Sequence, residues 1–406
     1  MPTPKGGMLM TETVSVDRRD RVPLWRDGMW RAVVAAFTFN GLLFGVWASR
    51  VPAFKEGFDL EPGTLGLLLL ALAGGAIVSF PLAGALSEKW GADRLTIRCA
   101  VVYGPALIAL GLAPGPVALA LLLFLFGASH GSMDVAMNGW GARVEDRLQR
   151  STMSVFHAAF SLGAGLGAAS GYAAVSAGFG VLPHFAAIVM PFGILALCFM
   201  VPAADQERAV ASDASSAPLL ALPRGPLLLV GLIALSASMG EGAIADWGAV
   251  FLRIAVQATE AQAALGYAVF SVMMVLVRLS GGYLTERFGP VLTTRASAVS
   301  ALTGLLLSVF GGSLEIVLVG YGLIGAGYAV VMPLVFSRAA RDAEMPSGPA
   351  IASVATLGYG GMLLGPPLIG FVAELTGLRM SFLLLAALAV MAFYLAPCLG
   401  VSRNRV

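Results

Sequence analysis

Three polar side chains follow one another at four-residue intervals inside a single apolar stretch: His130, Asp134 and Asn138. This spacing places all three on one face of a helix. Because an apolar wall disfavours a charged carboxylate, Asp134 is suited to bind and release a proton. Alternatively, Asp134 pairs with His130, His157 or a basic residue and only ties helices together. His157 is a weaker candidate for the same chemistry.

A second carboxyl group lies deep in another apolar stretch. Glu241 comes about 14 residues after that stretch begins, or about 21 Å along a helix. An ionisable side chain at this depth costs about 2.5–3.5 kcal/mol unless it is paired or faces water, and no basic residue of the same stretch lies deep enough to pair with it. We therefore expect Glu241 to bind solute or protons. Asn40, at middle depth in the first stretch, is a candidate hydrogen-bond partner for a polar solute.

Two further charged residues occupy similar depths near the outer ends of their stretches. Arg50 follows Trp47, and Asp246 directly precedes Trp247, which lies at an equivalent place in the second half of the chain. These positions predict an ion pair between Arg50 and Asp246, flanked by the two tryptophans, that closes the outer side of a solute path. Trp247 could instead be an anchor at the membrane surface, which is a frequent use of tryptophan.

The elements that hold these residues must lie in lipid. Hydrophobic residues make up 58% of the 406 residues and charged residues only 12%, which is too little polar surface to cover a soluble globule of this size. Apolar runs of about 20 residues predict twelve transmembrane helices, and hence an all-α membrane protein. They are expected near 31–51, 63–87, 94–113, 117–141, 151–175, 179–201, 226–251, 261–285, 291–311, 313–337, 348–374 and 378–400.

The two halves of the chain are tandem copies. The sequence GALSEKWG at 84–91 returns 198 residues later as GYLTERFG at 282–289. A parallel repeat of this length predicts two six-helix bundles related by a pseudo-twofold axis along the membrane normal, with a solute site between them. We assign residues 31–201 to the N-terminal bundle and 226–400 to the C-terminal bundle.

The basic residues set the orientation. Lys and Arg concentrate at the cytoplasmic ends of spans, and with both termini in the cytoplasm only four of the 25 fall at outer ends. We expect a cytoplasmic N-terminal tail over 1–30, a cytoplasmic linker over 202–225 and a short cytoplasmic tail over 401–406. Residues 1–30 show no apolar stretch and no cleavage site typical of a signal peptide.

Twelve spans, the duplication and the repeated loop pattern G-x-L-x-[DE]-[RK]-x-G together resemble the major facilitator superfamily. More narrowly, the segments 47–53 and 127–138, and Glu241 with Asp246-Trp247, are similar to the YbjJ-type bacterial inner-membrane permeases, a group near the fucose permeases. The resemblance covers about 30–400. It implies transport by alternating access in the bacterial cytoplasmic (inner) membrane, with a proton-coupling carboxylate at the position of Asp134.

In that superfamily, the loop after the second span makes charged contacts that hold the inner gate closed. The resemblance assigns this role to a set of residues in each half, and we include Arg278, which lies one turn before the second loop. The inner-gate set is Gly84, Glu88, Lys89, Gly91, Arg94, Arg278, Gly282, Glu286, Arg287 and Gly289. The first copy has Glu88 where Asp is usual, so its gate is expected to be weaker. These charges could also merely mark a solvated turn.

Other functions lack sequence support. The three cysteines are isolated, and there is no Walker loop or nucleophile elbow, so we expect no enzyme, no metal and no cofactor. The net charge of +2 is spread over inner loops and gives no nucleic-acid footprint. The sequence favours proton-coupled uptake of a small polar organic solute, sugar-like or related, by a monomer in the lipid bilayer, with the proton gradient as energy source. Alternatives are a proton-antiport exporter of metabolites or drugs and, more remotely, a non-transporting solute sensor.

Overall fold

The computed structural model describes residues 23–150, 152–207, 223–345 and 347–400. Within these ranges the chain is helical and contains no strand. The predicted tail over 1–30 and the predicted linker over 202–225 fall mostly outside the described residues, and the predicted tail over 401–406 falls wholly outside them.

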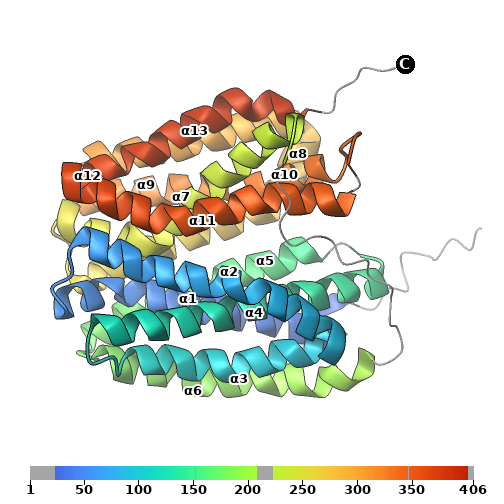
Figure 1. Cartoon of the computed structure of the whole chain (residues 1–406), viewed down its shortest axis with the longest axis horizontal. Helices are drawn as coiled ribbons and strands as arrows, with labels where there is room; N and C mark the ends of the chain where they lie inside the picture. Colours follow the sequence, from blue (N-terminus) through green and yellow to red (C-terminus); the bar gives the residue numbers. More distant parts are fainter. Residues whose placement is uncertain (1–22, 151, 208–222, 346, 401–406) are drawn as a thin grey trace, which may run out of the picture.

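Two bundles of helices follow each other along the chain (Figure 1). The N-terminal bundle contains α1 (Gly28–Gly57), α2 (Pro62–Trp90), α3 (Ala92–Leu110), α4 (Pro116–Leu148), α5 (Met153–Ser176) and α6 (Val181–Met200). The C-terminal bundle contains α7 (Pro226–Ala255), α8 (Glu260–Phe310), α9 (Leu314–Tyr328), α10 (Val331–Ala339), α11 (Ser347–Thr376), α12 (Leu378–Ser381) and α13 (Leu383–Leu395). Short 3-10 helices are η2 (Leu24–Arg26), η3 (Val201–Glu207) and η4 (Ala396–Leu399).

These helices confirm the predicted all-α membrane fold. In the described part of the chain, ten helices are long and apolar enough to cross a membrane. The other predicted spans also have helical counterparts, because α8 covers two of them with a break at Gly289, and α3 covers the span expected over 94–113. Two spans are interrupted, one between α9 and α10 and one between α12 and α13.

The duplication extends to the packing of one backbone on another. In the N-terminal bundle, a Cβ added at Gly127 of α4 would lie under 3.0 Å from the carbonyl oxygen of Leu72 in α2. In the C-terminal bundle, a Cβ added at Gly325 of α9 would collide in the same way with the carbonyl oxygen of Phe270 in α8. Gly325 follows Gly127 by 198 residues, and Phe270 follows Leu72 by the same number. Small residues let membrane helices approach this closely, so each bundle is tightly packed within itself.

The turns of the repeated loop are equivalent as well. Gly91 follows α2 with a φ of 89°, and Gly289 interrupts α8 with a φ of 76°. Glycine adopts this backbone region at little cost because it has no Cβ. The last glycine of each loop copy therefore reverses the chain between two spans.

The boundary between the bundles is built from helices of both halves. α5 packs against α8, α2 packs against α11, and α1 touches both α7 and α8. We call the end at which α1 and α7 begin the inner end, following the orientation predicted from the basic residues, and the opposite end the outer end. In Figure 1 the two bundles diverge toward the inner end, where α13 ends.

Neighbouring glycines of α2 test the packing inside a bundle. A Cβ at Gly75 would lie under 3.0 Å from the carbonyl oxygen of Phe124 in α4, whereas a Cβ at Gly74 would meet nothing within 4 Å. Gly75→Ala should therefore reduce the yield of monodisperse protein in detergent and lower its melting temperature by several degrees, while Gly74→Ala should change neither. Equal behaviour of the two variants in size-exclusion chromatography and thermal unfolding would contradict this close contact.

Candidate functional site

A polar cluster from α1, α3 and α4 lies in the middle of the N-terminal bundle. The Asn40 side-chain amide donates to the backbone oxygen of His130 at 3.4 Å, and the His130 Nδ1 lies 3.1 Å from the hydroxyl of Tyr103. The His130 ring also stacks on Phe44, with ring centroids 5.1 Å apart. The structure therefore brings Asn40 and His130 together, as the sequence predicted for a common site. The side-chain oxygen of Asn40 is buried and has no hydrogen-bond partner among the described residues.

Asp134 lies one turn further along α4 and is half-buried. Its Oδ1 accepts a hydrogen bond from the Asn138 amide at 3.1 Å, and the same amide donates to the Asp134 backbone oxygen at 2.8 Å. Among the described residues Asp134 has no ion pair with His130 or His157. It interacts electrostatically with Tyr359 of α11, whose ring packs against Phe80 of α2 across the boundary. It also interacts electrostatically with Tyr103 of α3, so the carboxyl group lies within reach of residues from both bundles.

Glu241 has a cationic partner that the sequence prediction missed. The Arg278 Nη2 of α8 lies 3.4 Å from each of the two Glu241 carboxylate oxygens. The same guanidinium donates through Nη1 to the Ser161 hydroxyl of α5 at 2.6 Å. The assignment of Arg278 to the inner gate was therefore wrong for this conformation. Arg278 lies on the next helix, and its long side chain reaches the middle of the membrane. The sequence prediction considered only basic residues of the span that contains Glu241 and therefore missed it.

A break in a helix supplies another partner to Arg278. The backbone oxygen of Ala329 accepts a hydrogen bond from the Arg278 Nε at 3.3 Å. Ala329 lies between the end of α9 at Tyr328 and the start of α10 at Val331. Broken helices are tolerated at membrane depth where they are buried in protein or line a water-filled cavity. The interruption therefore belongs to the same central region as Glu241.

His157 of α5 faces this central region. Its side chain is exposed, its ring packs edge-on against Phe37 with centroids 5.3 Å apart, and Arg278 acts on it electrostatically. The Ser161 hydroxyl links the two, because it accepts from Arg278 and donates to the His157 backbone oxygen at 3.1 Å. Ser161 was not among the sequence candidates, since a single serine in an apolar span carries no distinguishing pattern.

The central charged side chains have access to water. The Glu241 side chain is 27% exposed and that of Arg278 is 13% exposed, although both lie at the boundary between the bundles at middle depth. The ion pairs and the backbone contact that join the bundles near Arg50, Glu56 and Gly63 lie at the outer end. The central residues are therefore reached by water from the end at which α1 and α7 begin.

The outer end is closed around Arg50, which is 2% exposed. Its Nη1 lies 2.6 Å from the Glu260 carboxylate of α8, in the opposite bundle. Within its own bundle, Arg50 donates to the His184 Nδ1 at 3.2 Å and to the Phe179 backbone oxygen at 2.5 Å. The predicted Arg50–Asp246 pair was wrong. Asp246 is 9% exposed and forms no ion pair within the described residues.

Two other contacts close the same end. Arg253 of α7 lies 2.6 Å from the Glu56 carboxylate of α1, and Glu374 of α11 accepts a hydrogen bond from the Gly63 backbone of α2 at 2.9 Å. Trp47 and Trp247 are 1% and 0% exposed, so Trp247 is not an anchor at the membrane surface. Trp47 packs against Phe54 and Phe126 inside its own bundle.

The residues of the predicted inner gate form no closed gate in the described part of the chain. Its loop charges Glu88, Lys89, Glu286 and Arg287 are exposed, and they form no ion pair in the described part of the chain. Arg94 is half-buried and interacts with other residues. The gating role of this set stays a prediction, because an open gate leaves its contacts unformed.

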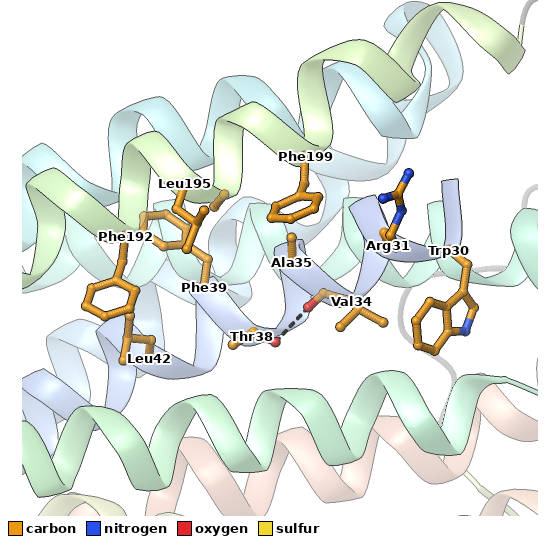
Figure 2. Close-up of a pocket in the computed structure, with 11 residues that line it drawn as sticks. Trp30, Arg31, Val34, Ala35, Thr38, Phe39, Leu42, Phe192, Leu195 and Phe199 are labelled. Carbon is orange, nitrogen blue, oxygen red and sulfur yellow. Dashed lines mark hydrogen bonds between the residues drawn. The ribbon is translucent and has the colours of Figure 1, made fainter. Parts of the chain in front are cut away.

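An apolar groove of about 300 Å³ lies away from these residues, between α1 and α6 (Figure 2). Its walls include Phe39, Phe192 and Phe199, and the Thr38 hydroxyl beside it is already donated to the Val34 backbone oxygen at 2.8 Å. The α6 side chains around the groove are largely exposed and apolar, which in a membrane protein means contact with lipid. The groove therefore does not suit a polar solute.

Comparison with known proteins agrees with this fold. Residues 32–348 match the Major Facilitator Superfamily. An uncharacterised transporter, y4wD, of Sinorhizobium fredii is 46% identical over 370 residues, which cover 91% of this chain and 98% of that protein. An uncharacterised MFS-type transporter of Yersinia pestis is 33% identical, and the matched residues cover 86% of this chain and 89% of that protein. The crystal structure of the nucleoside transporter NupG shares the fold, with a TM-score of 0.69 at 16% identity, over 93% of this chain and 100% of that chain.

The chain therefore belongs to the Major Facilitator Superfamily and is a multi-pass membrane protein of a transporter family. Its twelve helical segments form two six-helix bundles related by a pseudo-twofold axis along the membrane normal, as the sequence predicted.

Neutralising Glu260 tests the outer closure. Glu260→Gln leaves the buried Arg50 charge without its counter-charge, so the outward-open population should rise at least about tenfold. The measurement is the spin-label distance between Leu112→Cys and Gly312→Cys, two exposed outer positions, in a protein lacking Cys99, Cys198 and Cys398.

Glu56→Gln is the matched control for this experiment. It removes the partner of Arg253, but the Glu56 side chain is 51% exposed, and exposed ion pairs contribute only about 0–1 kcal/mol. A distance distribution that responds to Glu56→Gln as strongly as to Glu260→Gln would contradict the dominant role of Arg50.

Proposed function

We propose that the protein is a proton-coupled symporter that carries a small polar organic solute across the bacterial inner membrane by alternating access. One observation carries this proposal. Two carboxyl groups deep in apolar spans, Asp134 of the N-terminal bundle and Glu241 of the C-terminal bundle, are each partly exposed. A site of this kind can exchange protons and solute with one side of the membrane at a time.

Asp134 is the proposed coupling carboxyl. Its described partner is the neutral amide of Asn138, so no permanent cation holds it in the charged form. When the cavity closes and water leaves, an ionised Asp134 would therefore lie in hydrocarbon without a counter-charge, which is unfavourable. Protonation before closure avoids this cost, which couples movement of the bundles to a proton. Glu241 differs because Arg278 stands beside it.

The solute is proposed to contact polar groups of both bundles. Asn40 offers a buried side-chain oxygen without a partner, and Arg278 offers donors from the opposite side. The similarity of 47–53, 127–138 and Glu241 to the YbjJ-type permeases near the fucose permeases supports a sugar-like or related metabolite. The same similarity and the distribution of basic residues support the inner membrane, with both termini in the cytoplasm.

Closure at opposite ends completes the proposed cycle. In this conformation the outer end is held by Arg50 and Glu260. In the outward-open conformation, the exposed loop charges Glu88, Lys89, Glu286 and Arg287 would come together as the inner gate. A weak inner gate would favour a state that is open at the inner end.

Proton flux in liposomes tests the coupling. The purified protein is reconstituted around a pH-sensitive dye and offered sugars, sugar acids and polyols. The wild type should show solute-driven proton entry for one solute class, and Asp134→Asn should reduce it to the rate of protein-free liposomes, because an amide cannot carry the proton. Glu315→Gln, a change at an exposed outer position, is the matched control and should keep the wild-type rate.

Two results would overturn the proposal. Proton movement only in exchange for lipophilic cations would replace it with the antiport exporter. Full proton entry in Asp134→Asn would move the coupling role to another carboxyl group.

A further inference from the structure

The partners of Arg278 leave part of its guanidinium unused. A guanidinium carries five N–H donors. In this structure Nε serves the Ala329 backbone oxygen and Nη1 serves the Ser161 hydroxyl at 2.6 Å. Nη2 lies 3.4 Å from both Glu241 oxygens, whereas a charge-assisted hydrogen bond is about 2.7–2.9 Å long. One N–H of Nη1 therefore has no partner among the described residues, and the Nη2 donors are held only by long contacts that a better acceptor can replace.

The long distance between Arg278 and its carboxylate partner is particular to this pair, because the corresponding distance for Arg50 is short. Arg50 is 2% exposed and lies 2.6 Å from the Glu260 carboxylate. Arg278 is 13% exposed and lies 3.4 Å from Glu241, whose side chain is about as exposed (27%) as that of Glu260 (30%). The two pairs therefore differ in the burial of the guanidinium and in the distance, and the longer, partly exposed Arg278 pair can exchange its partner.

Building on the proposed symport, we infer that Arg278 binds the carboxylate of an organic-acid solute such as a sugar acid, and that Glu241 takes up a proton as the solute displaces it. Two parallel N–H donors match the two oxygens of a carboxylate, which favours this class over a neutral solute. The Ser161 hydroxyl and the Ala329 carbonyl hold the guanidinium from the other directions.

The charges at the site before and after binding explain why Glu241 would take up a proton. Before binding, Arg278 and Glu241 neutralise each other. After binding, the solute carboxylate neutralises Arg278, and a charged Glu241 would stand beside a second anion. Uptake of one proton by Glu241 removes that repulsion, so solute binding draws one proton to Glu241, separate from the proton that Asp134 takes up before the cavity closes.

The surroundings of Glu241 supply no competing permanent cation among the described residues. The ionisable groups that act on this region are Arg278 and Tyr267 of α8, Tyr328 of α9, His157 of α5 and Asp246 of its own helix. Tyr328 packs directly on Gly240, and Tyr267 is within electrostatic reach of both Glu241 and Arg278. Arg278 is therefore the group that an anionic solute would meet.

Matched probes test the carboxylate preference. Binding of D-glucuronate, D-galacturonate and D-gluconate to the purified full-length protein is compared with binding of D-glucose, D-galactose and D-glucosamine, by thermal shift and calorimetry. At least one acid should bind at least about tenfold more tightly than its neutral and amine counterparts. The absence of such a preference in every set, or tighter binding of glucosamine, overturns the inference.

Variants of the pair test the assignment to these residues. Arg278→Gln should remove the preference, and Arg278→Lys should weaken binding because lysine lacks the planar fork. Arg341→Gln, at an exposed inner position, is the control and should bind as the wild type does. Retention of full preference in a folded Arg278→Gln protein overturns the assignment. If that variant fails to fold, Ser161→Ala serves in its place and should weaken acid binding at unchanged pH dependence; unchanged affinity overturns the assignment.

The pH dependence tests the role of Glu241. Wild-type affinity for the acid should fall by up to about tenfold per pH unit between about pH 6 and pH 8, because one proton is bound with the anion. Glu241→Gln should bind at pH 8 as tightly as the wild type does at pH 6, since the amide is always neutral. Equal wild-type affinity at both pH values overturns the proton step. These readouts need no proton transport, so they separate a wrong solute class from a wrong symport proposal.

Discussion

A charge inside hydrocarbon must be paired or hydrated, and this constraint organises the boundary between the two bundles. Arg50 and Arg278 both lie at that boundary, and each has partners in both bundles: Arg50 through Glu260 and His184, and Arg278 through Glu241 and Ser161. When the bundles move apart at either place, a charged group must lose a partner and gain water or another ligand. The energetics of the conformational change are therefore concentrated in a few side chains.

The duplicated packing supplies the rigid bodies that such a switch requires. In both halves, glycines at equivalent positions bring one helix onto the backbone of another, at Gly127 with Leu72 and at Gly325 with Phe270. Contacts of this kind leave little room for deformation inside a bundle. The boundary between bundles carries the interrupted helix at Ala329 and the exposed central side chains, so change is expected there.

Local sequence features were sufficient for most of the fold. Apolar runs predicted the helical segments, and the repeated loop predicted the equivalent turns at Gly91 and Gly289, because hydrophobic length and glycine conformation act over neighbouring residues. Partners of charged residues were predicted less well. Asp246 and Glu260 both lie toward the outer end, and depth along a helix does not say which side of the helix a residue faces, so Arg50 was given the wrong partner.

Arg278 illustrates the same limit. Its position one turn before Gly282 suggested the inner gate, but the length of its side chain and the break at Ala329 bring the guanidinium to Glu241. For Asp134 and Asn138 the common helix face is seen in their hydrogen bond, because a four-residue spacing fixes it without reference to any other helix, while the role of these residues stays a prediction.

The central claim is that an anion arriving at Arg278 brings a proton to Glu241. The most direct measurement counts protons by titrating the tightest-binding sugar acid into the purified protein in buffers of different ionisation enthalpy. The account predicts uptake of about one proton per bound solute in the wild type and none in Glu241→Gln. A binding enthalpy that is independent of the buffer in the wild type would contradict it.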